Sequence, residues 1–148
     1  MFADVLEKPK PQPVKAEKRP TILIVDDDEA LVDVLSHRLR QQEFDTMTAE
    51  SGESGLALAR SERPSLIVLD LRLPDIDGFA ICEELADSPD TCEIPVIILS
   101  GMERADILRR CRAAGCQYFV RKPYDPNALL LLIRQAIRDS RQWGGMDY

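Results

Sequence analysis

Residues 65–78 read SLIVLDLRLPDIDG, and this stretch decides the fold. Four apolar residues, Leu66 to Leu69, run directly into an acid, Asp70. A short apolar run that is rich in branched side chains and bounded by turn formers indicates a buried strand of a parallel sheet. An acid on the last residue of such a strand lies at the carboxyl edge of the sheet, where open α/β folds bind their ligands. Because an unpaired buried carboxylate is costly, we expect Asp70 to have partners or a reactive role there.

Strand-like and helix-like segments alternate along the rest of the chain. Apolar runs such as Thr21–Val25 and Ile94–Leu99 indicate buried strands, whereas apolar residues three and four apart, as in Gly78–Asp87, indicate helices that pack on a core. Five strands that alternate with five helices predict an α/β fold, a doubly wound parallel sheet with helices on both faces. The other expected strands are Phe44–Ala49, Leu66–Asp70 and Cys116–Val120, and the other expected helices begin at Glu29 or span Ser51–Arg60, Arg104–Ala114 and Pro126–Asp139.

Some polar and apolar side chains are expected to shape these helices rather than to act in a site. Asp28 is a candidate N-cap of the first helix, and Asp75 and Asp77 are expected to be turn or helix-start acids. The spacing in the first helix predicts a buried apolar stripe. Its members are Leu31, Val34, Leu35 and Leu39.

Length, composition and charge describe one acidic domain behind a basic arm. The 148 residues suffice for a domain with its own core, and 45% hydrophobic with 30% charged residues is ordinary for a globular protein. Residues 1–20, rich in Lys and Pro, are expected to be a disordered arm, residues 21–140 the domain and residues 141–148 a frayed tail. The arm is net basic although the whole chain has a net charge of −7, so the domain is strongly acidic. This charge disfavours direct binding to nucleic acid and favours a divalent cation.

Hydropathy and cysteine spacing predict a cytoplasmic protein with no membrane partner. The apolar runs are too short to cross a bilayer, and the N-terminus lacks the apolar segment of a secretory signal. Cys82, Cys92, Cys111 and Cys116 show no C-x-x-C spacing, which disfavours a zinc site. We therefore expect reduced cysteines that pack in the core.

Polar residues stand at the ends of the expected strands. Asp26 and Asp27 follow the first strand, Asp70 ends the third, Ser100 follows the fourth and Lys122 follows the fifth. In a doubly wound sheet these ends can converge on one crevice. Carboxylates that lie close together repel one another, so a hard cation such as Mg²⁺ is needed to keep them ionised. A lysine and a hydroxyl nearby complete a phosphoryl site, and a carboxylate can be the nucleophile of phosphoryl transfer.

Taken together, these strand ends resemble the response-regulator receiver domain of two-component signalling. The matching segments are ILIVDDDE, LIVLDLRLPDIDG, VIILSG and GCQYFVRKPY, in this order and each at a strand end. The resemblance extends from about Pro20 to Arg141. It implies a (βα)5 flavodoxin-like fold, similar to the chemotaxis regulators, with strand order 2-1-3-4-5.

Residue by residue, the resemblance implies an acceptor and a set of metal ligands. Asp70 resembles the phosphoacceptor of the family. Asp27 resembles a direct ligand of Mg²⁺, whereas Asp26 resembles the acid that acts largely through water. The backbone carbonyl of Arg72 resembles the remaining protein ligand. Mg²⁺ is thus the implied cofactor, with Mn²⁺ as a substitute.

The resemblance also implies the parts of a switch. Ser100 resembles the switch hydroxyl, and Lys122 resembles the phosphate-binding lysine. Phe119, three residues before this lysine, resembles the rotating aromatic residue, whereas its neighbour Tyr118 does not align there. The Lys122-Pro123 bond resembles the cis peptide of the family.

The implied function is a self-phosphorylating and self-dephosphorylating switch rather than a turnover enzyme. A histidine kinase or a histidine phosphotransfer protein donates a phosphoryl group to Asp70, Ser100 moves toward the acyl phosphate, and Phe119 rotates inward. The face made by the fourth helix, fifth strand and fifth helix then signals to a downstream protein that the sequence does not identify. Because few residues follow the last helix, no output domain is expected in this chain.

Two other functions compete with the switch. Phosphohydrolases of the haloacid-dehalogenase type also use an Asp nucleophile, Mg²⁺, a hydroxyl and a lysine, and Asp26-Asp27-Asp28 supplies a D-x-D after the first strand. That family has its nucleophile on the first strand and a cap or a longer core, whereas Asp70 lies on the third strand of a short chain. An adaptor that is never phosphorylated is the other alternative, and the complete set of site residues disfavours it.

Two features are less usual for the family. A long Arg72 beside Met102 is expected to shield the phosphoryl group from water and to prolong its lifetime. In the final helix, Leu131 and Leu132 fall outside the core stripe and are expected to contact a partner or a second copy, unless they pack under the tail near Trp143. The stripe itself is Leu129, Leu130, Ile133, Ala136 and Ile137.

Overall fold

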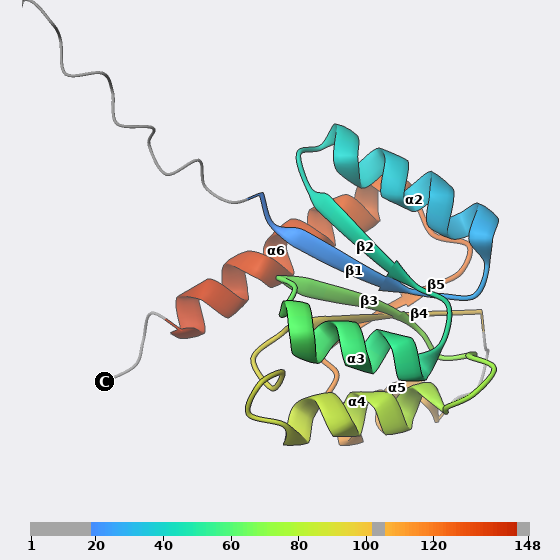
Figure 1. Cartoon of the computed structure of the whole chain (residues 1–148), viewed down its shortest axis with the longest axis vertical. Helices are drawn as coiled ribbons and strands as arrows, with labels where there is room; N and C mark the ends of the chain where they lie inside the picture. The colour runs from blue at the N-terminus through green and yellow to red at the C-terminus, as the bar shows by residue number, and fades with distance from the viewer. Residues whose placement is uncertain (1–18, 102–105, 145–148) are drawn as a thin grey trace, which may run out of the picture.

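The computed structural model describes residues 19–101 and 106–144, which form one parallel sheet between two layers of helices (Figure 1). The strands are hydrogen-bonded in the order β2-β1-β3-β4-β5, so the predicted fold class and strand order are confirmed. The strands are β1 (Thr21–Val25), β2 (Asp45–Ala49), β3 (Leu66–Asp70), β4 (Val96–Ser100) and β5 (Tyr118–Arg121). The helices are α2 (Glu29–Gln41), α3 (Gly52–Glu62), α4 (Gly78–Asp87), α5 (Ile107–Ala113) and α6 (Pro126–Gly144).

Helices α2 and α6 cover one face of the sheet, and α3, α4 and α5 cover the other (Figure 1). Successive side chains of a strand point to opposite faces, so each central strand contributes to both cores. In β1, Ile22 and Ile24 pack under α2 and α6, whereas Leu23 and Val25 pack on the side of α3 to α5. All five residues of β3 are buried. This explains the unbroken apolar run that ends at Asp70.

The predicted boundaries are correct for β1, β3 and α4 but not for β4. Helix α4 and strand β1 have the bounds that the sequence predicts. Strand β4 begins later, at Val96 rather than Ile94, because the N–H of Ile94 still donates to the carbonyl of Thr91 in the preceding turn. Ser100 is the last residue of this strand rather than the residue after it.

The last strand and the last helix differ more from the prediction. Strand β5 begins at Tyr118 rather than Cys116, because the N–H of Cys116 donates to the carbonyl of Cys111 at the end of α5. Helix α6 starts as predicted, with the Asp125 carboxylate accepting from the N–H of Asn127 at 3.1 Å. It continues to Gly144, so the predicted end at residue 139 is wrong.

Two residues of the predicted α2 stripe are not buried, since Leu31 is only half-buried and Val34 is exposed. The side chain of Val34 is 62% exposed, whereas Val32 is 7% exposed and lies in the core. Leu35 and Leu39 are buried as predicted. Both sets of residues satisfy a helical repeat through these two leucines, and the docking of α2 on the sheet decides between them.

All four cysteines are free thiols, and three of them pack in the core as predicted, whereas the prediction is wrong for Cys92. Cys82, Cys111 and Cys116 are buried between the sheet and helices α4 and α5, and Cys92 is exposed. The thiols of Cys82 and Cys116 form a hydrogen bond that raises the pKa of Cys82 and lowers that of Cys116. Burial raises the pKa of Cys111 to about 11.

Several predictions concern residues outside the described ranges. These are the arm up to residue 18, Met102 and the tail from residue 145. Within residues 19–101 and 106–144, no helix has both the length and the hydropathy of a membrane span.

Candidate functional site

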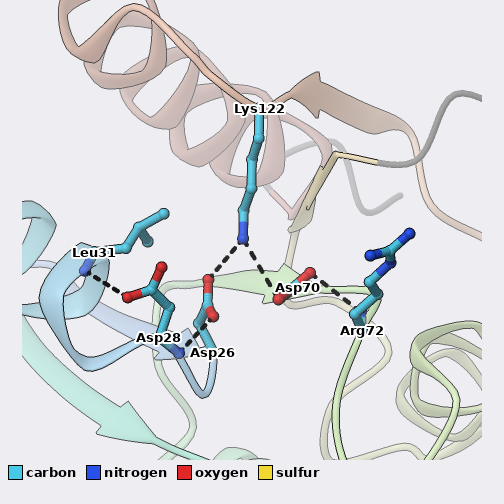
Figure 2. A network of polar contacts seen from close by, with 6 residues as sticks. All are labelled: Asp26, Asp28, Leu31, Asp70, Arg72 and Lys122. Carbon is cyan, nitrogen blue, oxygen red and sulfur yellow. Dashed lines mark hydrogen bonds and ion pairs between the residues drawn. The ribbon is translucent and has the colours of Figure 1, made fainter.

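The pairing of the strands brings the predicted site residues to one edge of the sheet. In the parallel register Asp70 is opposite Leu99, and Ser100 is opposite Arg121, the residue before Lys122. Asp26 and Asp27 directly follow β1, which lies beside β3. Figure 2 shows the side chains of Asp26, Asp70 and Lys122 directed toward one another. The sequence prediction that these strand ends converge is therefore correct.

Asp26, Asp27 and Asp70 form an acidic cluster. One carboxylate oxygen from each residue lies within 4.8 Å of the others. Asp26 is 3% and Asp70 7% exposed, whereas Asp27 is exposed to solvent. Burial raises the pKa of Asp70, a hydrogen bond from the N–H of Arg72 opposes this effect, and the negative charge of Asp26 adds to it. The cluster is thus short of positive charge.

Lys122 supplies part of that charge. Its Nζ lies 3.0 Å from Oδ2 of Asp26 and 3.4 Å from Oδ2 of Asp70 (Figure 2). Burial lowers the pKa of Lys122, but the bond to Asp26 and the charge of Asp70 outweigh it, so the pKa is raised overall. The ammonium is therefore charged at neutral pH. The peptide bond between Lys122 and Pro123 is cis, as the resemblance implies.

Backbone groups hold the two buried carboxylates in place (Figure 2). The N–H of Arg72 donates to Oδ1 of Asp70 at 3.1 Å, and the N–H of Asp28 donates to Oδ1 of Asp26 at 3.0 Å. Asp28 is also the N-cap of α2, as predicted, because its Oδ1 accepts from the N–H of Leu31 at 3.2 Å. The side chain of Arg72 is exposed. Each buried carboxylate thus has one oxygen bonded to the backbone and the other near Lys122.

The predicted switch residues lie on β4 and on β5, the strand that leads into Lys122. Ser100 is fully buried, and its carbonyl accepts from the N–H of Lys122 at 2.9 Å. Phe119 lies on β5 opposite Ile98 of β4. It is half-buried and packs against the core on the side of α3 to α5. The ring is thus partly exposed and already in contact with the core.

The two leucines that were predicted to be exposed on α6 are not alike. Leu131 is 63% exposed, as predicted. Leu132 is partly buried and packs against the core between the sheet, α2 and α6, so the prediction that it is exposed is wrong. The core stripe of α6 is buried as predicted.

Sequence reasoning missed the role of Asp75. Asp77 is the N-cap of α4, as predicted, with its Oδ1 accepting from the N–H of Phe79 at 3.0 Å. Asp75, however, accepts hydrogen bonds from Gly52 and Glu53 at the start of α3. No sequence signal identifies this partner, because the two segments are 22 and 23 residues apart.

A comparison with protein-family models identifies the family of this protein. The family model of the response regulator receiver domain matches residues 22–134. The chain therefore belongs to the receiver domains of two-component response regulators, as the sequence predicts. Receiver domains are phosphorylation-dependent signalling switches, and this is the class of function that the chain has.

Curated relatives share this domain within longer proteins. The DNA-binding dual master transcriptional regulator RpaA of Synechocystis sp. is 36% identical over 119 residues, which cover 80% of this chain and 49% of that protein. Response regulator PleD of Caulobacter vibrioides is 36% identical over 118 residues, which cover 79% of this chain and 26% of that protein. The chain thus spans about half or less of the length of these relatives.

Solved structures have the same fold over nearly their whole length. A response regulator receiver domain protein (CheY-like) from Methanospirillum hungatei JF-1 is 26% identical with a TM-score of 0.79, covering 84% of this chain and 98% of that chain. The signal receiver domain of a signal transduction histidine kinase from Syntrophus aciditrophicus is 28% identical with a TM-score of 0.76, covering 81% of this chain and 91% of that chain.

Proposed function

We propose that Asp70 accepts a phosphoryl group from a phosphohistidine of a partner protein and that the acyl phosphate switches the output surface of the domain. The observation that supports this most is the environment of Asp70. Its carboxylate is nearly buried at the end of β3, beside two further carboxylates and 3.4 Å from the ammonium of Lys122. A carboxylate nucleophile with cationic groups around it is suited to phosphoryl transfer.

The donor set fits Mg²⁺, with Mn²⁺ as a substitute. Hard divalent cations bind carboxylate and carbonyl oxygens, and Mg²⁺ retains several waters, so few protein ligands suffice. Asp26, Asp27 and Asp70 would hold the ion, with Asp26 acting largely through water. The carbonyl of Arg72 would be the remaining protein ligand, as the resemblance implies. The raised pKa of Asp70 supports the fit, because burial and the charge of Asp26 disfavour an ionised carboxylate that lacks a cation. When bound, the ion supplies positive charge next to the phosphoryl oxygens.

The residues of the chain provide the nucleophile and hold it. A carboxylate oxygen of Asp70 attacks phosphorus, the bond between phosphorus and the donor nitrogen breaks, and the imidazole leaves with the electron pair. The N–H of Arg72 orients the carboxylate through Oδ1. Lys122, already charged and near Oδ2, is placed to stabilise a phosphoryl oxygen. Hydrolysis of the acyl phosphate resets the domain.

Ser100 and Phe119 are proposed to transmit the change. Strand β4 ends in the buried Ser100 and pairs with β5, which carries Phe119 and leads into Lys122. A hydroxyl that moves toward the phosphoryl group would vacate space beside the half-buried ring, which would then turn inward. The surface of α5, β5 and α6 would change as a result. The exposed Arg72 side chain is proposed to shield the phosphoryl group from water.

The proposed partners are proteins. The donor would be a histidine kinase or a histidine phosphotransfer protein, and the target a downstream protein that recognises the α5-β5-α6 surface. Leu131, exposed on α6, supports a contact with that target or with a second copy of the chain. Leu132 is no longer part of this surface, because it packs against the core.

Incubation with acetyl phosphate and MgCl₂, followed by intact-mass spectrometry, tests the proposal. We expect one phosphoryl adduct on the wild type and none in EDTA or on Asp70→Asn. Asp26→Asn should still form the adduct, more slowly. An adduct that persists on Asp70→Asn and is absent from Asp26→Asn would contradict the proposal and indicate a nucleophile after the first strand.

A further inference from the structure

Asp75 lies in the loop between β3 and α4, yet its carboxylate binds the start of α3. Its Oδ1 accepts from the N–H of Gly52 at 2.8 Å, and its Oδ2 accepts from the N–H of Glu53 at 2.9 Å. These are the first amides of α3, which have no acceptor within the helix. The N-cap Ser51 binds the amide of Ser54 at 3.1 Å instead. The start of α3 is thus satisfied partly by its own cap and partly by Asp75.

The carboxylate of Asp75 is ionised in this contact. The hydrogen bond from the N–H of Glu53, and next to it the bond from Gly52, lower the pKa of Asp75. The positive end of the α3 dipole acts in the same direction. Asp75 therefore makes a charge-assisted, two-oxygen contact at neutral pH.

The loop and α3 also pack closely at this point. Gly52 is buried, and a Cβ on it would lie 2.7 Å from Cδ1 of Ile81 and 3.0 Å from Cβ of Ile76. A residue without a side chain lets the backbone of α3 come this near to Ile76 of the loop and Ile81 of α4. Asp75 and Gly52 thus form one contact between two segments that are far apart in the sequence.

Hydrogen bonds connect both segments of this contact, the loop and the residues before α3, to the acidic cluster. In the loop, the N–H of Arg72 holds Asp70. Before α3, the carbonyl of Ala49 accepts from the N–H of Asp26 at 3.0 Å. Asp75 bridges these two sides, because it ties the loop that contains Arg72 to the helix that follows Ala49.

We infer that Asp75 is a positioning residue that sets the affinity of the acidic cluster for Mg²⁺. By binding α3, Asp75 holds the loop so that the carbonyl of Arg72 keeps a fixed position relative to Asp26 and Asp27. Mg²⁺ demands near-ideal octahedral geometry, so a loop that can shift costs affinity. This inference rests on the function proposed above.

Calorimetric titration of the unphosphorylated full chain with MgCl₂ tests the inference without any phosphoryl transfer. Asp75→Ala is expected to weaken Mg²⁺ binding about tenfold, the lower end of the range for groups that orient metal ligands. Asp75→Asn keeps one acceptor oxygen and should fall between Asp75→Ala and the wild type. Ser51→Ala is the matched control, because it removes a cap from the same helix end but leaves the loop contact intact. It should bind Mg²⁺ like the wild type although it lowers the urea midpoint.

Two results would overturn the inference. One is an Mg²⁺ affinity of Asp75→Ala within about twofold of the wild type. The other is an equal loss in Ser51→Ala, which would show that the stability of α3 alone accounts for the effect. Circular dichroism establishes that each variant is folded, and Asp75→Asn decides the matter if Asp75→Ala is not. A wild type that binds no Mg²⁺ at all would instead refute the proposed function itself, and the inference with it.

Discussion

The ammonium of Lys122 lies closer to Asp26 than to Asp70: Nζ is 3.0 Å from Oδ2 of Asp26 and 3.4 Å from Oδ2 of Asp70. The lysine thus bridges two nearly buried carboxylates that reach the site from β1 and β3. It compensates their charge before any phosphoryl group arrives. Because it already lies near Asp70, the ammonium could move toward the negative charge that a phosphoryl group on Asp70 would add.

Replacing Lys122 by Met is expected to destabilise the domain, because Asp26 and Asp70 then face each other without the ammonium. Removing one partner of a buried pair leaves an uncompensated charge, and the partial exposure of Lys122 limits the loss to about 2 kcal/mol. Urea unfolding at pH 7 measures it. Arg63→Met is the matched control, because Arg63 and Asp90 form a 2.9 Å pair whose side chains are 66% and 55% exposed. A loss below about 1 kcal/mol is expected there, and equal losses would contradict the account.

Asp70 is expected to destabilise the metal-free domain at neutral pH. Burial raises its pKa above the ordinary value of 3.8, so the folded domain binds this proton more tightly than the unfolded chain does. The stability that this proton contributes is present below pH 3.8 and is lost as the pH rises through the folded pKa. In EDTA at pH 7, the free energy of unfolding of Asp70→Asn should exceed that of the wild type by about 1 kcal/mol. A difference that does not shrink toward acidic pH would refute this explanation.

Mg²⁺ is expected to make the wild type more stable than Asp70→Asn, the reverse of their order in EDTA. A ligand that binds only the folded state adds about 2.7 kcal/mol to the free energy of unfolding at a hundredfold excess over its dissociation constant. The wild type should gain this stability, whereas Asp70→Asn should gain less, because a neutral amide oxygen binds Mg²⁺ more weakly than a carboxylate. Urea unfolding in MgCl₂ and in EDTA measures both. Identical wild-type midpoints in the two buffers would count against a metal site.

Arg72→Asn is expected to shorten the lifetime of the acyl phosphate about threefold, because a short side chain no longer shields it from water. The decay is followed by mass spectrometry after acetyl phosphate is removed. Arg60→Asn is the control, since Arg60 is an exposed residue of α3 that pairs with Glu84 away from the site. An unchanged lifetime in Arg72→Asn would refute the shielding role.

Leu131→Ser and Leu132→Ser are expected to differ in stability, because Leu131 lies on the surface of α6 and Leu132 packs against the core. Leu131 is exposed, so its replacement should change stability by no more than about 0.5 kcal/mol, whereas Leu132→Ser should cost about 2 kcal/mol.

Sedimentation velocity of the beryllofluoride form tests the contact with a second copy. We propose that the activated wild type dimerises through this face, and we expect Leu131→Ser to sediment as a monomer. Indistinguishable sedimentation of the two proteins would exclude a dimer through Leu131.

The sequence predicted the features that depend on local patterns. The apolar run before Asp70 identifies a strand, and the polar residues at the strand ends identify the site because parallel strands end at one edge. The caps Asp28 and Asp77 are recognisable for the same reason, since each binds amides of the helix it precedes.

Features that depend on distant packing were missed or wrong. Val34 and Val32 both satisfy the helical period, and only the docking of α2 on the sheet buries Val32. The core beside α6 likewise accepts Leu132. Asp75 has the sequence context of a turn acid, and its partner at α3 becomes visible only when the loop and the helix are placed together.

Direct identification of the phosphorylated residue is the most direct test of phosphoryl transfer to Asp70. Borohydride reduces an acyl phosphate of aspartate to homoserine, so peptide mapping after acetyl phosphate treatment in MgCl₂ locates the acceptor. We expect homoserine at position 70 alone, and only when the metal is present. Homoserine at position 26 or 27, or none in MgCl₂ while the protein is folded, would contradict it.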